Sequence, residues 1–155
     1  MLFPNIWGFK GGIQVYSRIL WQTLRALYPE VTCDVFLKYD RQTDIATVPE
    51  RTRFHCFGHL SRWQQSLGLA ISVLTRGIRQ RPTLAIATHL NYGIVLYWLE
   101  FLTGTPYWIV VHGLEGWNLN HPLRVKALQN AERGLPSATT PALASSKNNI
   151  CLPIA

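Results

Sequence analysis

The chain has 155 residues, of which 48% are hydrophobic and 15% are charged. This length and apolar content are enough for one globular domain with a buried core, and they exclude an intrinsically disordered chain. The formal net charge of +7 at pH 7 favours anionic partners, such as a phosphate-bearing ligand, nucleic acid or an acidic membrane surface. Because Lys and Arg are spread along the chain, an ordinary solvated basic surface is an equal alternative.

The cysteines and the first residues of the chain indicate the cellular compartment. Cys33, Cys56 and Cys151 form an odd count without the spacing of metal ligands. This usage favours a reducing cytoplasm over a disulfide framework, and we assign these cysteines no role. The chain does not open with a basic segment followed by an apolar one, so we predict no secretory signal.

One segment, residues 92–111, is apolar enough to suggest a membrane span. Gly104 and Pro106 interrupt it, and a carboxylate at Glu100 would be costly in mid-membrane. We therefore predict a buried helix followed by a buried strand.

Apolar periodicity along the chain predicts strands that alternate with helices. The predicted strands are residues 1–3, 31–38, 52–57, 84–88 and 107–111. The predicted helices are residues 13–28, 60–79, 93–103 and 122–132. Such alternation is typical of a largely parallel sheet with right-handed crossovers. The first strand is short for a central position, and we expect its beginning to be missing.

The strand at 107–111 ends at His112 and Gly113. In open α/β sheets, ligands bind beyond the carboxyl ends of the strands. His112 is therefore a candidate site residue, and Gly113 allows a ligand or a neighbouring backbone to come close. A histidine that is hydrogen-bonded inside the fold is the equal alternative.

Two other turns follow predicted strands. Gly11 and Gly12 precede the first predicted helix, where backbone N–H groups can bind phosphate, although two such glycines more often make a simple turn. His89 and Asn91 follow the strand at 84–88. They could face a cleft, but a local cap of the next helix by Asn91 is the slightly favoured alternative.

Taken together, these segments resemble the N-terminal domain of family 4 glycosyltransferases, which are two-domain GT-B enzymes. The resemblance covers residues 1–133 and rests on the order of four short motifs. These are the Gly-Gly loop, a helix that begins Ile-Gln-Val-Tyr-Ser, Thr-His-Leu-Asn at 88–91, and Pro-Tyr-Trp at 106–108 leading into His-Gly-Leu-Glu-Gly-Trp at 112–117. The resemblance implies an α/β fold: a Rossmann-like parallel sheet with helices on both faces, the N-terminal half of a GT-B fold.

The same resemblance implies an activity. Members of the family typically transfer a sugar from a nucleotide-sugar donor to an acceptor with retention of anomeric configuration and without a metal ion or other cofactor. The implied partners are a nucleotide-sugar and a glycan or lipid-linked acceptor, as in cell-envelope polysaccharide synthesis, and not nucleic acid. The implied location is cytoplasmic, with peripheral contact at the inner face of the membrane left open.

The resemblance also implies roles for single residues. Gly11 and Gly12 match the glycine loop that approaches the donor phosphates or the acceptor, and Asn91 is expected on the acceptor side. His112 matches the histidine that lies against the donor sugar, where it would support charge developing near the anomeric carbon. Glu115 is not required as a general base in such an enzyme. A hydrolase would need two carboxylates, and the sequence nominates no second one.

The C-terminal residues depart from the family pattern. After residue 133 the family continues with a strand and a Val-Ser-x-Tyr-Thr-Arg motif, whereas residues 134–155 are rich in Pro, Ser, Thr and Ala. Synonymous codons for residues 134–144 exist that encode Ile-Ala-Val-Ser-His-Tyr-Thr-Arg in a shifted frame. We hypothesise that residues 134–155 are an out-of-frame tail; a natural disordered tail is the alternative.

Without the second domain, which holds most of the donor in this family, we expect the chain alone to be inactive. We also expect the sheet to lack the strand after residue 132. One other hypothesis is a binding domain without catalysis. Another is a basic nucleic-acid or membrane-surface module that uses Arg76, Arg79 and Arg81 with aromatic contacts from Trp63, Trp98 and Trp117. Large aromatics at such spacing are more often core, which disfavours this module.

Overall fold

The computed structural model describes residues 1–8, 11–45, 47–112, 121–131 and 133–136, the last of these by backbone alone. Six strands form one sheet: β1 (Leu2–Phe3), β2 (Cys33–Leu37), β3 (Thr52–Cys56), β4 (Ala85–Ala87), β5 (Tyr107–Val111) and β6 (Arg133–Pro136). Their order is β3-β2-β1-β4-β5-β6, and every neighbouring pair is parallel. The order reverses between β1 and β4, as in a doubly wound Rossmann-like sheet.

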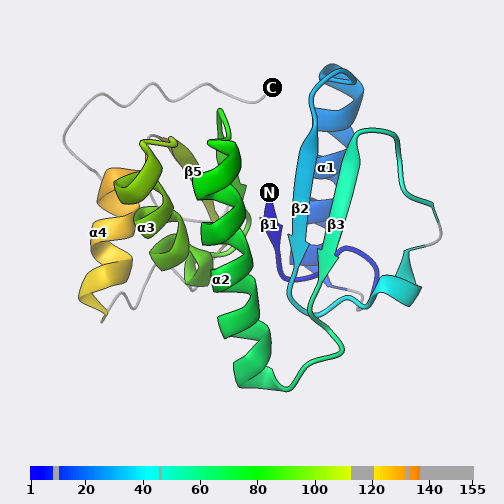
Figure 1. Ribbon diagram of the computed structural model, residues 1–155, viewed down its shortest axis with the longest axis horizontal. Helices are drawn as coiled ribbons and strands as arrows, with labels where there is room; N and C mark the ends of the chain where they lie inside the picture. Colours follow the sequence, from blue (N-terminus) through cyan, green and yellow to red (C-terminus); the bar gives the residue numbers. More distant parts are fainter. Residues whose placement is uncertain (9–10, 46, 113–120, 132, 137–155) are drawn as a thin grey trace.

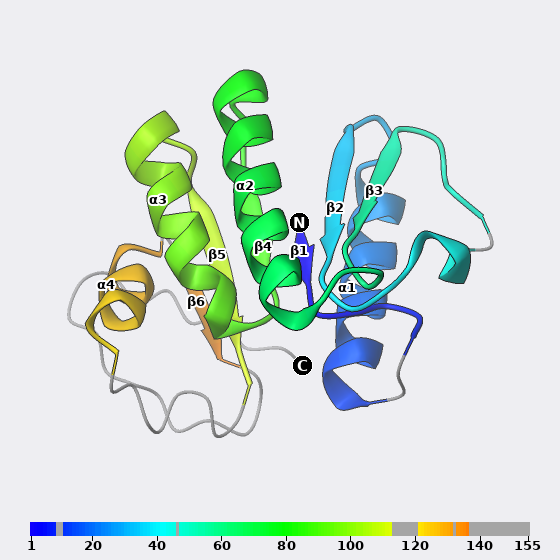
Figure 2. The same cartoon turned by 60° about the horizontal axis from the view of Figure 1, so that its bottom comes forward.

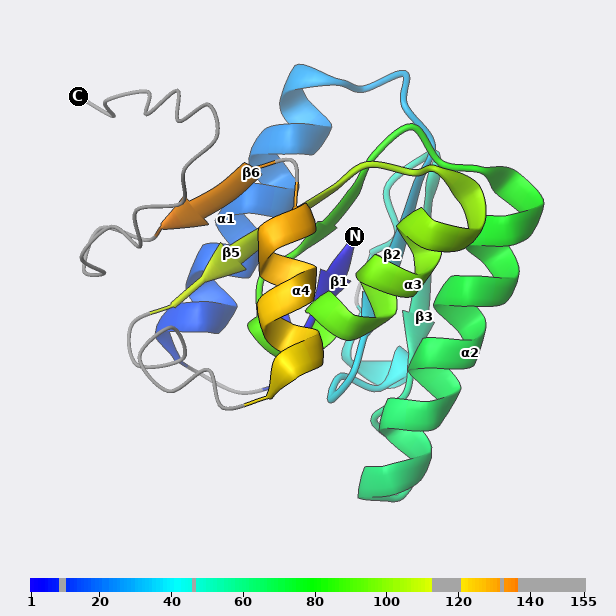
Figure 3. The same cartoon turned by 90° about the vertical axis from the view of Figure 1, so that its left-hand side faces the viewer.

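Helices cover both faces of this sheet. They are α1 (Gly12–Leu27), α2 (Arg62–Gln80), α3 (Gly93–Thr103) and α4 (Pro122–Asn130), with short 3₁₀ turns η1 (Gln42–Asp44) and η2 (Leu90–Tyr92). Figure 1 shows α1 behind β2 and β3, and Figure 3 shows α2, α3 and α4 in a row on the opposite face. The predicted α/β fold, with a parallel sheet and helices on both faces, is confirmed.

Strand β1 is short and yet central, because each of its two residues anchors a different core. Leu2 belongs to the core between the sheet and the layer of α2 and α3, together with Leu69 and Leu96. Phe3 belongs to the core under α1, with Trp21 and other buried residues. Successive side chains of a strand point to opposite faces, which explains this division. Figure 2 shows β1 in the middle of the sheet, between β2 and β4.

The expectation that no strand follows residue 132 is wrong. Residues 133–136 form β6, which pairs with β5 in the register Trp108↔Arg133 to Val111↔Pro136. A parallel ladder needs only extended backbone, and Pro136 is tolerated because it ends an edge strand. The hypothesis about the reading frame stays a prediction, and residues 137–155 lie outside the described part of the chain.

Helix α3 is less buried than the sequence predicts. It begins and ends as predicted, and Leu96 and Leu99 are buried, but Trp98 and Phe101 are 43% and 71% exposed. No further layer of described residues lies over the outer side of this helix, so only its inner side reaches the core. Trp63 on α2 is likewise exposed, contrary to the expectation of core aromatics, and Trp117 lies outside the described residues.

Within the described ranges, no helix is both long and apolar enough to cross a bilayer.

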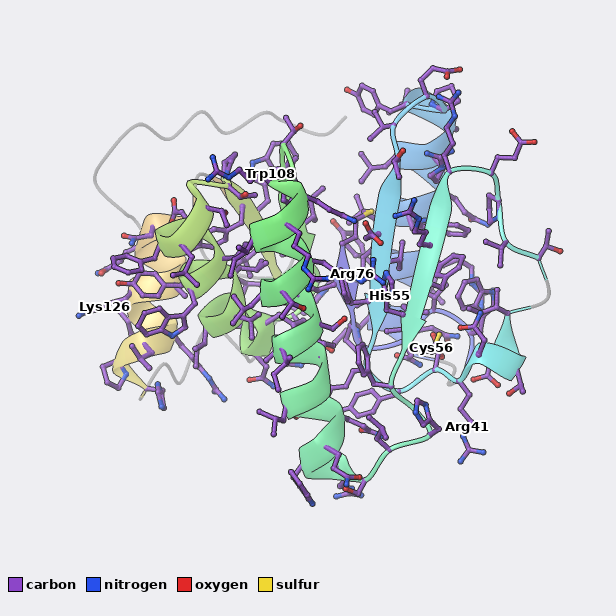
Figure 4. All side chains as sticks on the ribbon, viewed as in Figure 1. Arg41, His55, Cys56, Arg76, Trp108 and Lys126 are labelled. Atoms are coloured by element: carbon purple, nitrogen blue, oxygen red, sulfur yellow. The ribbon has the colours of Figure 1, made fainter. Side chains whose placement is uncertain are left out.

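A polar cluster joins α2 to the β2–β3 side of the sheet. His55 Nε2 lies 2.7 Å from Asp34 Oδ1, and Arg76 Nη1 lies 3.7 Å from the same oxygen. Figure 4 shows Arg76 on α2 next to His55 on β3. The His55 ring also stacks on Phe36. Burial lowers the pKa of His55, and this outweighs the hydrogen bond with Asp34, which raises the pKa. The folded protein therefore favours neutral His55, which donates its N–H to the carboxylate.

This lowered pKa predicts that acid destabilises the fold. At pH above the unfolded-state pKa of about 6.5 the contribution of His55 is complete, and it is lost as the pH falls through the lower folded-state pKa. We expect the free energy of unfolding, measured by urea titration, to fall between pH 7.5 and 5.5. The fall should be smaller in His55→Gln, which keeps an N–H donor but does not titrate. The exposed His59 supplies the control His59→Gln, which should behave as wild type. An equal fall in all three proteins would contradict the assignment.

Candidate functional site

A cavity of about 290 Å³ lies at the carboxyl ends of β1, β2 and β4, where the strand order reverses. Ligands of open α/β sheets bind at this switch point. Four chain segments line the cavity: Pro4 and Asn5 after β1, Gly11 to Gln14 at the start of α1, Lys38 and Tyr39 after β2, and His89, Asn91 and Tyr92 after β4. The structure therefore brings together three of the predicted site residues, Gly11, Gly12 and Asn91.

The glycine at position 12 is not required by the packing of the fold. A Cβ atom built on Gly12 meets nothing within 4 Å. Gly11 has φ −163° and ψ 164°, an extended conformation that any residue can adopt. A side chain at Gly12 would occupy open space beside the cavity, so the fold tolerates one, and glycine leaves the N-terminus of α1 uncovered.

The cavity wall is suited to an anion. The N-terminal end of α1 carries the positive end of the helix dipole, and its first turn contains no acidic residue. Lys38 adds a cationic side chain from the end of β2. Tyr39 stacks under this lysine, with Nζ 5.3 Å from the ring centroid. A phosphate or another negatively charged group would therefore be stabilised at this end of the sheet.

Asp40 fixes the loop that follows β1. Its carboxylate is fully buried and accepts hydrogen bonds from the backbone N–H groups of Ile6, Trp7 and Gly8, at 2.5, 3.2 and 2.7 Å. Three successive donors around one carboxylate give charge-assisted bonds, which are stronger than bonds between neutral groups. The loop is thus held to the segment after β2.

Helix α1 holds the same loop from its other side. The carbonyl oxygen of Ile6 accepts bonds from Gln14 Nε2 at 2.9 Å and from Arg18 Nη2 at 2.6 Å. Deeper in the fold, the hydroxyl groups of Ser17 and Thr88 lie 2.8 Å apart, and both residues are fully buried. These contacts fix the start of α1 relative to β1 and β4, and so fix the walls of the cavity.

Asn91 is available to the cavity because His89 performs the local capping. The expected alternative was that Asn91 caps the following helix. In the structure His89 precedes η2, and its Nδ1 accepts a bond from the Asn91 backbone N–H at 3.1 Å. The side chain of Asn91 is exposed and lines the cavity.

His112 directly follows β5, as predicted, but it is not among the residues that line the cavity. It is partly buried, and its ring packs edge-to-face on Tyr16 with centroids 5.2 Å apart. Tyr16 lies on α1, one turn after the glycines, so His112 is connected to the cavity wall through this helix. Burial raises the pKa of the Tyr16 phenol, which is therefore neutral at pH 7.

None of the remaining candidate residues adds a described side chain to the cavity lining. Gly113 and Glu115 lie outside the described residues. Burial and the nearby Asp40 raise the pKa of Cys56 to about 11, so its thiol is not a nucleophile at neutral pH. Among the described residues, no group of three or more His, Cys, Asp or Glu could hold a metal ion.

Lys38, Tyr39 and Asp40 are site residues that the sequence analysis did not identify. All three follow β2 directly, so the rule that nominated His89 and His112 applies to them as well. The signal was present, because the predicted strand at 31–38 ends at these residues. The contact between Asp40 and the loop after β1 joins segments far apart in the sequence, and no local pattern indicates it.

No family model, no curated protein and no solved structure matches this chain. The resemblance to family 4 glycosyltransferases therefore depends on the residue motifs alone.

The role of Asp40 can be tested by replacing one of its carboxylate oxygens. In Asp40→Asn, an amide N–H₂ group faces backbone N–H donors and the negative charge is lost. We expect the free energy of unfolding to fall by about 2 kcal/mol, in the range of hydrogen bonds to charged groups. Asp44→Asn is the matched control, since Asp44 is exposed and accepts the backbone N–H of Arg41. Urea unfolding measures this free energy. An equal decrease in the two variants would show that the contact with three donors stabilises the fold no more than the single bond of Asp44.

Proposed function

We propose that this chain is the N-terminal, acceptor-side domain of a retaining GT-B glycosyltransferase of family 4. The observation that carries the proposal is the position of Gly11, Gly12 and Asn91. These residues were matched to the family by sequence motif, and all three line one cavity at the switch point of a parallel sheet. Because these residues follow the neighbouring strands β1 and β4, a doubly wound sheet brings them together. The motifs supply the link to the family, and the cavity supplies a place where the matched residues could bind one ligand.

The chemistry of the cavity supports the same class of ligand. Nucleotide-sugars and many glycan acceptors carry phosphate, and the α1 N-terminus with Lys38 provides a positive potential for it. Asn91 supplies both a donor and acceptors, as recognition of sugar hydroxyl groups requires. One such domain forms one wall of the cleft, and the second wall comes from a second Rossmann-like domain.

His112 would act on the donor sugar from beside this cavity. His112 lies at the end of β5, and β5 pairs with β4, the strand that precedes the cavity residues His89 and Asn91. The imidazole ring contacts Tyr16 of α1. A ligand that extends from the α1 N-terminus toward β5 would approach the imidazole. A hydrogen bond from His112 to a sugar hydroxyl, or to charge near the anomeric carbon, is then the expected contribution to catalysis.

The binding site can be mapped by nuclear magnetic resonance. Isotope-labelled protein is titrated with UDP-, GDP- and ADP-sugars and with sugar phosphates. We expect at least one to shift the resonances of residues 11–14, 38–39 and 89–92. Asn91→Ala should weaken this binding about tenfold, the effect of losing one or two hydrogen bonds. Asn130→Ala is the matched control, an exposed asparagine at the end of α4. Because the second domain would hold most of the donor, this domain alone should bind weakly, with a Kd on the order of 1 mM. Shifts confined to other surfaces, or no shifts at ligand concentrations about tenfold above this Kd, would contradict the proposal.

The role of His112 is separated from general binding by comparing two ligands. If the imidazole contacts the donor sugar, His112→Asn should lower the affinity for the nucleotide-sugar about tenfold. The affinity for the free nucleoside diphosphate, which lacks the sugar, should be unchanged. His59→Asn is the control, because His59 is exposed on the loop before α2. Equal effects of His112→Asn on both ligands would indicate a structural role for His112. Such a result would favour a binding domain without catalysis.

A further inference from the structure

The outer side of the helical layer carries an exposed apolar surface. Helices α2 and α3 lie side by side on one face of the sheet, and the Leu99 side chain packs against Gly77. Large apolar side chains on the outer sides of these helices are between 43% and 71% exposed. We call them the α2–α3 surface: Trp63, Leu67, Ile71, Trp98, Phe101 and Leu102.

This surface is separate from the apolar side that α2 gives to the core. Leu69 and Val73 face the sheet and are buried, whereas Leu67 and Ile71, two residues earlier along the chain in each case, are exposed. At 100° per residue, such offsets place the two pairs on roughly opposite sides of the helix. A surface helix of a domain with one core has one apolar stripe. A second stripe with exposed tryptophan marks an interaction site.

The charges around the surface have one predominant sign. Arg76 on α2 pairs with Asp34 on the sheet side and is left out of this count. Of the six other charged side chains on α2 with its cap Arg81, on α3 and on α4, five are basic, and Glu100 is the exception. Arg62 lies beside Trp63 in the sequence, and Arg79 lies in the last turn of α2. Lys126 extends outward from α4 (Figure 4). The apolar side chains are thus bordered by cations on the same layer.

We propose that the α2–α3 surface docks on an anionic lipid bilayer. Interfacial segments combine tryptophan, phenylalanine and leucine, which enter the boundary between headgroups and acyl chains, with Lys and Arg, which contact anionic headgroups. The described helices are too short or too polar to span a bilayer, so the contact is peripheral. This inference concerns the surface of the helical layer and does not depend on the proposed transferase activity.

Two other partners for the α2–α3 surface, a second copy of this chain and nucleic acid, fit its side chains less well. A second copy of this chain, placed on the same surface by two-fold symmetry, would bring the two sets of cations together at a like-charged interface. Nucleic acid would satisfy the cations, but its phosphate backbone gives nothing to the aliphatic Leu67, Ile71 and Leu102. A bilayer with anionic lipid satisfies both kinds of side chain.

Vesicle binding tests the proposal. We expect the protein to sediment with phosphatidylcholine vesicles that contain about 30% phosphatidylglycerol, and not with phosphatidylcholine alone, with binding that weakens as salt increases. The double substitution Trp98→Ser with Phe101→Ser should lower the partition coefficient at least about tenfold. The matched control is Val15→Ser with Ile19→Ser, which removes exposed apolar side chains of α1 on the opposite face. Circular dichroism and a thermal melt establish that both variants are folded.

A second pair of variants tests the charges. Arg79→Gln with Lys126→Gln should lower binding and its salt dependence, whereas Arg41→Gln, on the loop before η1 and away from the layer in Figure 4, should not. Binding to both kinds of vesicle alike, binding to neither, or equal losses in the α1 control would overturn the proposal. Light scattering gives another contrary outcome: a dimer that Trp98→Ser with Phe101→Ser converts to a monomer would assign the surface to a second copy.

Discussion

The buried carboxylate of Asp40 is the interaction on which the candidate site depends. It binds three consecutive N–H groups of the loop after β1, and helix α1 binds the carbonyl group of Ile6 in that loop. The loop therefore has partners on both sides, and movement of α1 away from it would break the bonds that Gln14 and the charged Arg18 donate to Ile6. A site that would bind an anion partly through backbone groups needs this rigidity, because backbone N–H groups cannot adjust to a ligand as the side chain of Lys38 can.

Much of the fold could be predicted from the sequence, because strands and helices here have strong apolar periodicity. The helix at 93–103 and the strand at 107–111 have the predicted bounds, and the other predicted elements differ by up to two residues at their ends. The errors have physical causes. Periodicity shows which sides of α3 are apolar but not whether a further layer covers them. Strand β6 forms through backbone pairing with β5, which the composition of residues 133–136 does not reveal.

The candidate site was predictable where a residue lies at the end of a strand or the start of a helix. Gly12 and Asn91 were nominated in this way and meet at the cavity, while the same rule, applied to β2, would have found Lys38. His112 shows the limit of the rule. It lies at a strand end and still packs on Tyr16, because β5 lies one strand further from the switch point than β4. Position along the sheet decides this, and strand order is not contained in a single local pattern.

The two-residue strand β1 has a consequence for the order in which the molecule assembles. Leu2 pairs with Phe36 on one side and with Ala87 on the other, so both neighbours of β1 are distant in the sequence. By contrast, paired residues of β2 and β3 are 19 apart in the sequence (Cys33↔Thr52) and those of β4 and β5 are 22 apart (Ala85↔Tyr107), against 34 for Leu2↔Phe36 and 85 for Leu2↔Ala87. Because contacts between distant segments carry a larger loop-closure cost, we expect these two halves to form first. Strand β1 would then pair late with β2 and β4 and so join the two halves into one sheet.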